Sequence, residues 1–109
     1  MITRLALLIA LALLLAGCQT PAPDTAAKTF TYRCDDGRSV QAGYPDTDTA
    51  MLTLDGTSHR LHRAISADGA RYVGDDWQWW TKGMQQAWLA PLKPGETFTS
   101  ARGVDCHAP

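Results

Sequence analysis

The hydrophobic residues follow two different patterns, one at the start of the chain and one along the rest. Residues 5–16 read LALLIALALLLA, an unbroken apolar run. From residue 29 onward, short stretches alternate apolar and polar side chains, which is typical of strands with one buried face. None of these stretches shows the period of about 3.6 residues that marks an amphipathic helix. The pattern therefore predicts an all-β domain that follows one apolar segment.

Turn signals divide this domain into eight short strands. Asp36-Gly37, Asp55-Gly56 and Asp68-Gly69 are pairs that favour hairpin turns between alternating runs. The expected strands are residues 29–34, 38–44, 49–54, 57–65, 70–73, 77–82, 86–90 and 103–107. Such spacing is typical of a sandwich or a barrel, and consecutive hairpins favour an antiparallel meander. We expect a closed barrel, because closure leaves no exposed sheet edge.

The apolar run has the features of a lipoprotein signal peptide covering residues 1–17. Arg4 supplies a positive charge before the run, which is shorter than the about 20 residues that a membrane-spanning helix needs. The run ends Leu15-Ala16-Gly17-Cys18, which resembles the lipobox of bacterial lipoproteins. That resemblance implies cleavage before Cys18, lipidation of its thiol and acylation of its amino group. Because Gln19 rather than Asp follows, it also implies the outer membrane, with the domain facing the periplasm.

Length and charge limit the remaining chain to one small domain. Without residues 1–17, 92 of the 109 residues remain, with nine basic and eleven acidic side chains. This slight acidic excess argues against nucleic acid as a partner, since phosphate binding needs a clear cationic excess. Residues 18–28 are rich in Pro, Ala and Thr and have no apolar period, so we expect a flexible tether before a domain at 29–109.

Two cysteines are left once Cys18 is assigned to lipid. Cys34 and Cys106 lie near the two ends of the domain, and an oxidising compartment favours a disulfide between them. If they lie on the first and last strands, their bond helps to close the barrel. The alternative is a metal site of Cys34, Cys106 and His107, but no second close-spaced pair completes a zinc-binding pattern.

The sequence shows no pattern of an enzyme active site or of a cofactor site. It has no HExxH motif, no Gly-rich phosphate loop and no nucleophile motif, and most acidic residues stand in turns. His59 and His62 are three residues apart, so they point to opposite faces of a strand. We therefore expect a protein that is not an enzyme and that needs neither metal nor cofactor.

The tryptophans favour a binding surface in addition to the core. Trp77 and Trp79 share one face of a predicted strand, Gln78 and Trp80 share the other, and Trp88 lies on the next strand. Aromatic pairs across strands stabilise sheets, so most of these rings are expected in the core. A strand with tryptophan on both faces nevertheless presents at least one ring to solvent. An exposed ring next to Lys82 suits protein recognition or sugar stacking.

Two segments resemble the paired motifs of the MliC/PliC family, bacterial inhibitors of c-type (chicken-type) lysozyme. The family motifs run roughly Ser-Gly-x-x-Tyr and Tyr-x-x-Gly…Trp-x-Lys-Gly-x-x-Ala. The matching segments are Asp68-Gly69-Ala70-Arg71-Tyr72 and Trp79-Trp80-Thr81-Lys82-Gly83. Tyr32-Arg33-Cys34 near the start and Cys106 near the end also agree, so the resemblance covers about residues 30–106.

The resemblance implies an eight-stranded antiparallel barrel whose two motif loops enter the lysozyme cleft. There the family's serine and lysine meet the catalytic carboxylates. The lysozyme-binding residues implied for this chain are Asp68, Gly69, Tyr72, Trp80, Lys82 and Gly83. The leading hypothesis is a lipid-anchored inhibitor of c-type lysozyme. The alternative is a structural lipoprotein of the cell envelope that binds peptidoglycan or another glycan and does not inhibit lysozyme.

The sequence departs from the family motifs at two points. Asp68 stands where the motif has serine, and an ionised Asp cannot donate a hydrogen bond to a carboxylate. Three alternatives follow for Asp68. It shares a proton with the general acid of lysozyme, or it turns inward to pair with Arg71 or Lys82. In the third, inhibition of c-type lysozyme is weak and the target is another protein. The second departure is one extra residue before Ala87, which suggests a bulged loop.

Overall fold

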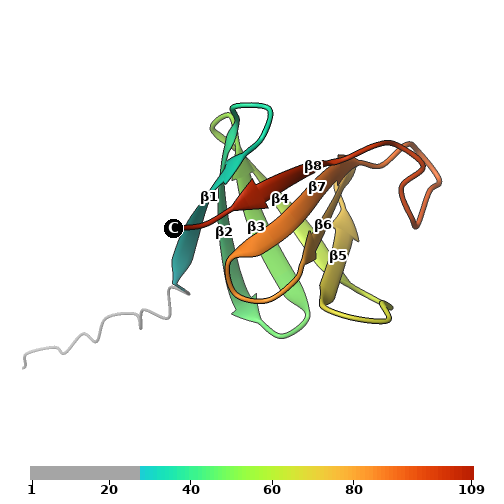
Figure 1. Ribbon diagram of the computed structural model, residues 1–109. Helices are drawn as coiled ribbons and strands as arrows, with labels where there is room; N and C mark the ends of the chain where they lie inside the picture. Colours follow the sequence, from blue (N-terminus) through green and yellow to red (C-terminus); the bar gives the residue numbers. More distant parts are fainter. Residues whose placement is uncertain (1–27) are drawn as a thin grey trace, which may run out of the picture.

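The computed structural model describes residues 28–109 and shows one closed barrel of eight antiparallel strands (Figure 1). Each strand pairs with its neighbour in the sequence, and β8 returns to pair with β1. The strands are β1 (Thr29–Cys34), β2 (Ser39–Asp46), β3 (Thr49–Leu54), β4 (Thr57–Ala64), β5 (Ala70–Gly74), β6 (Trp77–Thr81), β7 (Gln86–Pro91) and β8 (Val104–His107). The all-β meander barrel predicted from the sequence is confirmed.

The predicted signal peptide, Cys18 and the predicted tether as far as residue 27 lie outside the described residues. Within residues 28–109, no helix is long and apolar enough to cross a bilayer.

The barrel interior is filled by the inward half of each alternating strand. Trp79 of β6 is fully buried at its centre, and its ring meets Tyr32 of β1 edge-on at a centroid distance of 5.0 Å. The indole Nε1 of Trp79 donates a hydrogen bond of 2.8 Å to the hydroxyl of Tyr44, so its one polar atom is satisfied inside the core. The other fully buried core side chains are aliphatic or small: Val40, Ala42, Ala50, Leu52, Leu61 and Cys106.

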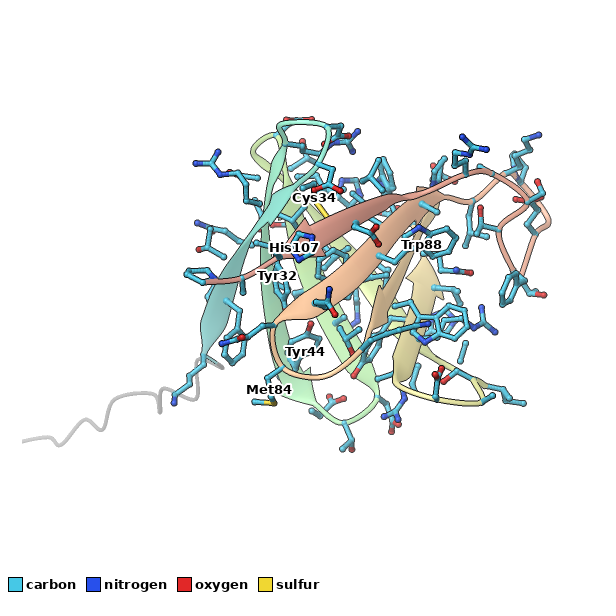
Figure 2. All side chains as sticks on the ribbon, viewed as in Figure 1. Tyr32, Cys34, Tyr44, Met84, Trp88 and His107 are labelled. Atoms are coloured by element: carbon cyan, nitrogen blue, oxygen red, sulfur yellow. A yellow bond between two sulfur atoms is a disulfide. The ribbon has the colours of Figure 1, made fainter. Side chains whose placement is uncertain are left out.

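A disulfide joins the first and last strands of the barrel. Cys34 and Cys106 are register partners across β1 and β8, and their sulfur atoms are bonded (Figure 2). The β1–β8 ladder consists of only this pair and Arg33 with His107, so the covalent bond stands at the shortest seam of the barrel. The predicted disulfide is confirmed. The metal alternative is wrong, because the sulfur atoms of Cys34 and Cys106 are bonded to each other.

The long connection between β7 and β8, residues 92–103, packs against the outside of the barrel. There the side chain of Gln78 is fully buried, although it points away from the barrel interior. Its Oε1 accepts hydrogen bonds from Arg71 Nη1 and from the backbone N–H of Thr99. The sequence pattern predicted that Gln78 and Trp80 share one face of the strand, and they do. The connection 92–103 covers Gln78 on that face.

Candidate functional site

The two motif loops lie side by side at one end of the barrel. The β4–β5 connection (65–69) carries Asp68 and Gly69, and the β6–β7 connection (82–85) carries Lys82 and Gly83. Since β5 and β6 pair with Ala70 opposite Thr81, the loop residues that precede Ala70 and follow Thr81 are neighbours. We call this end of the barrel, formed by the connections 47–48, 65–69 and 82–85, the motif end (Figure 1).

Trp80 links the two motif loops from the outer face of β6. Its indole Nε1 donates a hydrogen bond of 2.9 Å to the backbone carbonyl of Asp68 in the first loop. The ammonium of Lys82, in the second loop, lies 4.8 Å from the centroid of the Trp80 ring, within the range of a cation–π contact. One partly buried side chain thus sets the position of Asp68 and of Lys82.

Gly69 allows the first loop to approach β6 closely. Its φ of +65° lies in the left-handed region, and a Cβ at this position would lie 2.2 Å from the carbonyl oxygen of Thr81. It would also lie 3.1 Å from Nε1 of Trp80, which binds the neighbouring carbonyl of Asp68. Glycine is therefore required here for two independent reasons, conformation and space.

Gly69→Ala is expected to lower the free energy of unfolding by about 2–5 kcal/mol, because a left-handed conformation and a steric clash are combined. Gly56→Ala is the matched control, since Gly56 has a φ of +82° and a Cβ added there would meet no atom within 4 Å apart from its own chain neighbours. That control is expected to cost only about 1–2 kcal/mol. Urea unfolding of both variants measures the difference. Equal losses would show that Gly69 serves conformation alone.

The charged side chains of the two motif loops, Asp68 and Lys82, are exposed to solvent. Among residues 28–109, no ion pair includes Lys82 or Asp68, and both side chains are exposed to solvent. Asp68 does not turn inward to Arg71, because the buried Arg71 guanidinium bonds instead to the carbonyl oxygens of Ile65 and Thr97 and to Gln78. Nor does Asp68 pair with Lys82. The inward orientation expected as one possibility for Asp68 is therefore wrong.

Arg71 ties the first motif loop to the rest of the molecule. Its Nε donates to the Ile65 carbonyl at 2.9 Å, and its Nη1 donates to the Thr97 carbonyl at 2.8 Å. The guanidinium also lies 4.7 Å from the ring centroid of Phe98. The start of loop 65–69 and the long connection 92–103 are thus held by one buried cation.

Tyr72 lies beneath the loops in the wall of the barrel mouth. It is only 5% exposed, and its ring centroid is 5.6 Å from that of Tyr44. A cavity of about 230 Å³ opens at this end, lined by Phe30, Tyr32, Tyr44, Tyr72, Thr81, Gly83 and Met84. Burial raises the pKa of Tyr44 far above its usual range, so its hydroxyl keeps its proton. Tyr72, buried and part of the cavity wall, shapes the site from beneath the loops.

Two exposed apolar side chains and one serine at the motif end were missed by the sequence reasoning. Met84 is 79% exposed in loop 82–85 and lies below Tyr44 in Figure 2. Ile65, placed by the sequence at the end of a strand, is 89% exposed because β4 ends at Ala64. Ser66 donates a weak hydrogen bond of 3.4 Å to the Gly69 carbonyl. The available signal was position in a turn segment, since Met84 directly follows Gly83 and Ile65 and Ser66 precede Asp68-Gly69.

The extra residue before Ala87 is accommodated in the turn itself. The β6–β7 register runs without a shift from Trp77 opposite Pro91 to Thr81 opposite Ala87. The N–H of Lys82 then donates to the Gln86 carbonyl at 2.9 Å, which leaves residues 83–85 as the tip. The longer spacing therefore extends the loop beyond Lys82 and introduces no bulge into the ladder.

Comparison with known proteins gives consistent matches. The family described as membrane-bound lysozyme inhibitor of c-type lysozyme (MliC) matches residues 32–92. A protein of that name from Cupriavidus necator is 35% identical over 89 residues, which cover 79% of this chain and 68% of the relative. Another from Pseudomonas aeruginosa is 30% identical over 83 residues, which cover 72% of this chain and 63% of the relative.

A solved structure agrees with the fold. The crystal structure of Pseudomonas aeruginosa MliC in complex with hen egg white lysozyme aligns with a TM-score of 0.52 and 27% sequence identity. The alignment covers 87% of this chain and 99% of that chain.

Proposed function

The chain belongs to the MliC family of membrane-bound inhibitors of c-type lysozyme, and from this we propose that it inhibits a c-type lysozyme through the loops of its motif end. The complex of the Pseudomonas relative with hen egg white lysozyme supports this class of partner. In this proposal, Lys82 enters the active-site cleft, while Asp68, Gly69, Tyr72, Trp80 and Gly83 form or support the contact.

The observation that carries the proposal is the free ammonium of Lys82, held over Trp80 at the motif end. A glycosidase cleft contains two carboxyl groups that flank the scissile bond. An ammonium between them gains charge-assisted hydrogen bonds and occupies the place where positive charge develops on the sugar. Because Lys82 has no carboxylate partner among the described residues, it loses no ion pair on entering such a cleft.

The deciding experiment is inhibition of hen egg white lysozyme by the soluble protein that starts at residue 19. We expect inhibition at micromolar concentration, and we expect the protein alone to leave the substrate uncleaved, since the relatives are named as inhibitors and not as enzymes. A lysozyme of another structural type is the control. Absence of inhibition at micromolar concentration would reject c-type lysozyme as the target.

Asp68→Ser is expected to tighten the complex by about 1 kcal/mol, roughly fivefold in Kd. The exposed Asp68 carboxylate adds negative charge next to an acidic cleft, whereas a serine hydroxyl donates a hydrogen bond to a carboxylate. Asp35→Ser, in the β1–β2 connection at the opposite end, makes the same change in net charge and controls for long-range attraction. Weaker inhibition by Asp68→Ser would mean that Asp68 has a favourable partner on the enzyme.

We also propose that Cys18 anchors the protein to the outer membrane by lipid, with the domain in the periplasm. The family name supports membrane association, and the lipobox-like segment supports Cys18 as its site. β1 begins at the motif end, so the described part of the chain starts at the same end of the barrel as the two loops (Figure 1). Cys18→Ser is expected to move the protein from the membrane fraction to the soluble fraction, and unchanged membrane association would exclude this anchor.

A further inference from the structure

A groove of about 330 Å³ lies on the outer face of β6, β7 and β8, beside the motif end. Trp80 of β6 is the register partner of Trp88 of β7, and Trp88 is the partner of Asp105 of β8. The three side chains therefore form one row across the sheet. The full lining of the groove is Trp80, Lys82, Gln86, Ala87, Trp88 and Asp105, and we call it the tryptophan groove.

Both indoles of the tryptophan groove are held in place by neighbouring groups. Trp80 is fixed by its hydrogen bond to the Asp68 carbonyl and by edge-on packing against Phe98, at a centroid distance of 5.8 Å. Trp88, which is labelled on β7 in Figure 2, packs against the backbone at Gly103. A Cβ at Gly103 would lie 2.5 Å from Cε2 of Trp88. The two rings are thus pre-positioned, and each remains partly exposed.

The polar groups around the two rings are free to bind a ligand. Gln86 and Asp105 are exposed, and no side-chain hydrogen bond of either occurs among residues 28–109. Lys82 supplies up to three donors, Asp105 supplies acceptors, and Gln86 supplies both. The two apolar rings are therefore surrounded by donors and acceptors of mixed charge, and the Lys82 ammonium lies over the Trp80 ring.

This combination fits a saccharide. A pyranose ring presents apolar C–H groups on its faces and hydroxyl groups along its edges, so it can lie on an indole while its hydroxyls bond to the rim. A purely apolar ligand would leave Lys82, Gln86 and Asp105 unpaired, which is costly when they are covered. A polyanion would meet the carboxylate of Asp105. Aromatic walls with a few placed polar groups are the usual composition of a small-molecule site.

We propose that the tryptophan groove binds a saccharide through stacking on Trp80 and Trp88 and hydrogen bonds to Lys82, Gln86 and Asp105. This activity goes beyond lysozyme inhibition, since its ligand is a glycan and not an enzyme. Because Lys82 lines the groove and also serves the proposed inhibition, a bound saccharide and a bound lysozyme compete for this side chain.

The test uses the soluble protein from residue 19 without lysozyme. It is titrated with tri-N-acetylchitotriose and, in a second arm, with maltotriose, and binding is followed by calorimetry and tryptophan fluorescence. The two arms show whether N-acetyl groups are needed. We expect saturable binding of at least one saccharide, weakened about tenfold by Trp88→Ala and measurably by Gln86→Ala. Gln41→Ala, which makes the same change as Gln86→Ala at an exposed position of β2 outside the groove, is the matched control and is expected to bind like the wild type.

Two results would overturn the proposal. One is the absence of saturable saccharide binding at millimolar concentration in both arms. The other is saccharide binding that is unchanged in both Trp88→Ala and Gln86→Ala. Gln86 is exposed, so its variant tests the groove even if Trp88→Ala fails to fold. Loss of lysozyme inhibition in these variants without any saccharide binding would assign the groove to the protein contact instead. Saccharide binding by a protein that does not inhibit lysozyme would support the groove and reject only the proposed inhibition.

Discussion

Lys82→Ala weakens lysozyme inhibition by about 2 kcal/mol or more, roughly 30-fold in Kd, if the proposed contact is correct. In the complex, the Lys82 ammonium is desolvated between two carboxyl groups, and its removal leaves those groups without their cation. The loop itself is expected to keep its shape, because Trp80 remains bonded to the Asp68 carbonyl and the Lys82 N–H still bonds to Gln86. Inhibition constants against hen egg white lysozyme measure the change.

Two further variants separate the charge of Lys82 from its other contributions. Lys82→Met keeps an apolar stem over the Trp80 ring and removes the charge, so it is expected to lose nearly as much as alanine. Lys93→Ala makes the same change in net charge in the connection 92–103, at the opposite end of the barrel, and is expected to have little effect. Unchanged inhibition by Lys82→Ala would remove Lys82 from the contact.

Replacing Cys34 and Cys106 together with alanine lowers the free energy of unfolding by about 4 kcal/mol. The two cysteines are separated by 72 residues, so the bond restricts most of the unfolded domain, and the chain-entropy model gives about this value for such a loop. A domain this small buries limited apolar surface and depends strongly on a covalent link. The midpoint of thermal unfolding is expected to fall by about 15–25 °C.

Reduction of the wild-type protein is the matching control for the disulfide. It removes the covalent bond and leaves both side chains in place, so it separates loss of the link from loss of packing by the buried sulfurs of Cys34 and Cys106. Urea unfolding at constant reductant concentration gives the free energies. A loss below about 1 kcal/mol would show that pairing of β1 with β8 stands without the bond, or that the unfolded state retains structure.

Most of the barrel could be read from the sequence because its signals are local. Alternation of side chains fixes the buried face of each strand, and Asp-Gly pairs give the turns with left-handed backbone, as at Asp55 and Gly56. The ends of the predicted strands therefore differ from the observed ones by at most one residue, apart from the end of β2, which continues two residues further to Asp46. Ile65 was placed in a strand because its parity matches Leu61, but β4 ends before it.

The sequence by itself determined the fold class, the pairing of Cys34 with Cys106, and the two motif loops as the candidate site. It could not determine what covers the outer face of the sheet, because that depends on where the connection 92–103 packs. Only the tertiary structure showed that Gln78 is buried by that connection, and that Trp80 joins the Asp68 and Lys82 loops. The tryptophan groove likewise arises from three strands brought into register. Local patterns encode which way a side chain points, whereas contacts between distant segments decide what it meets there.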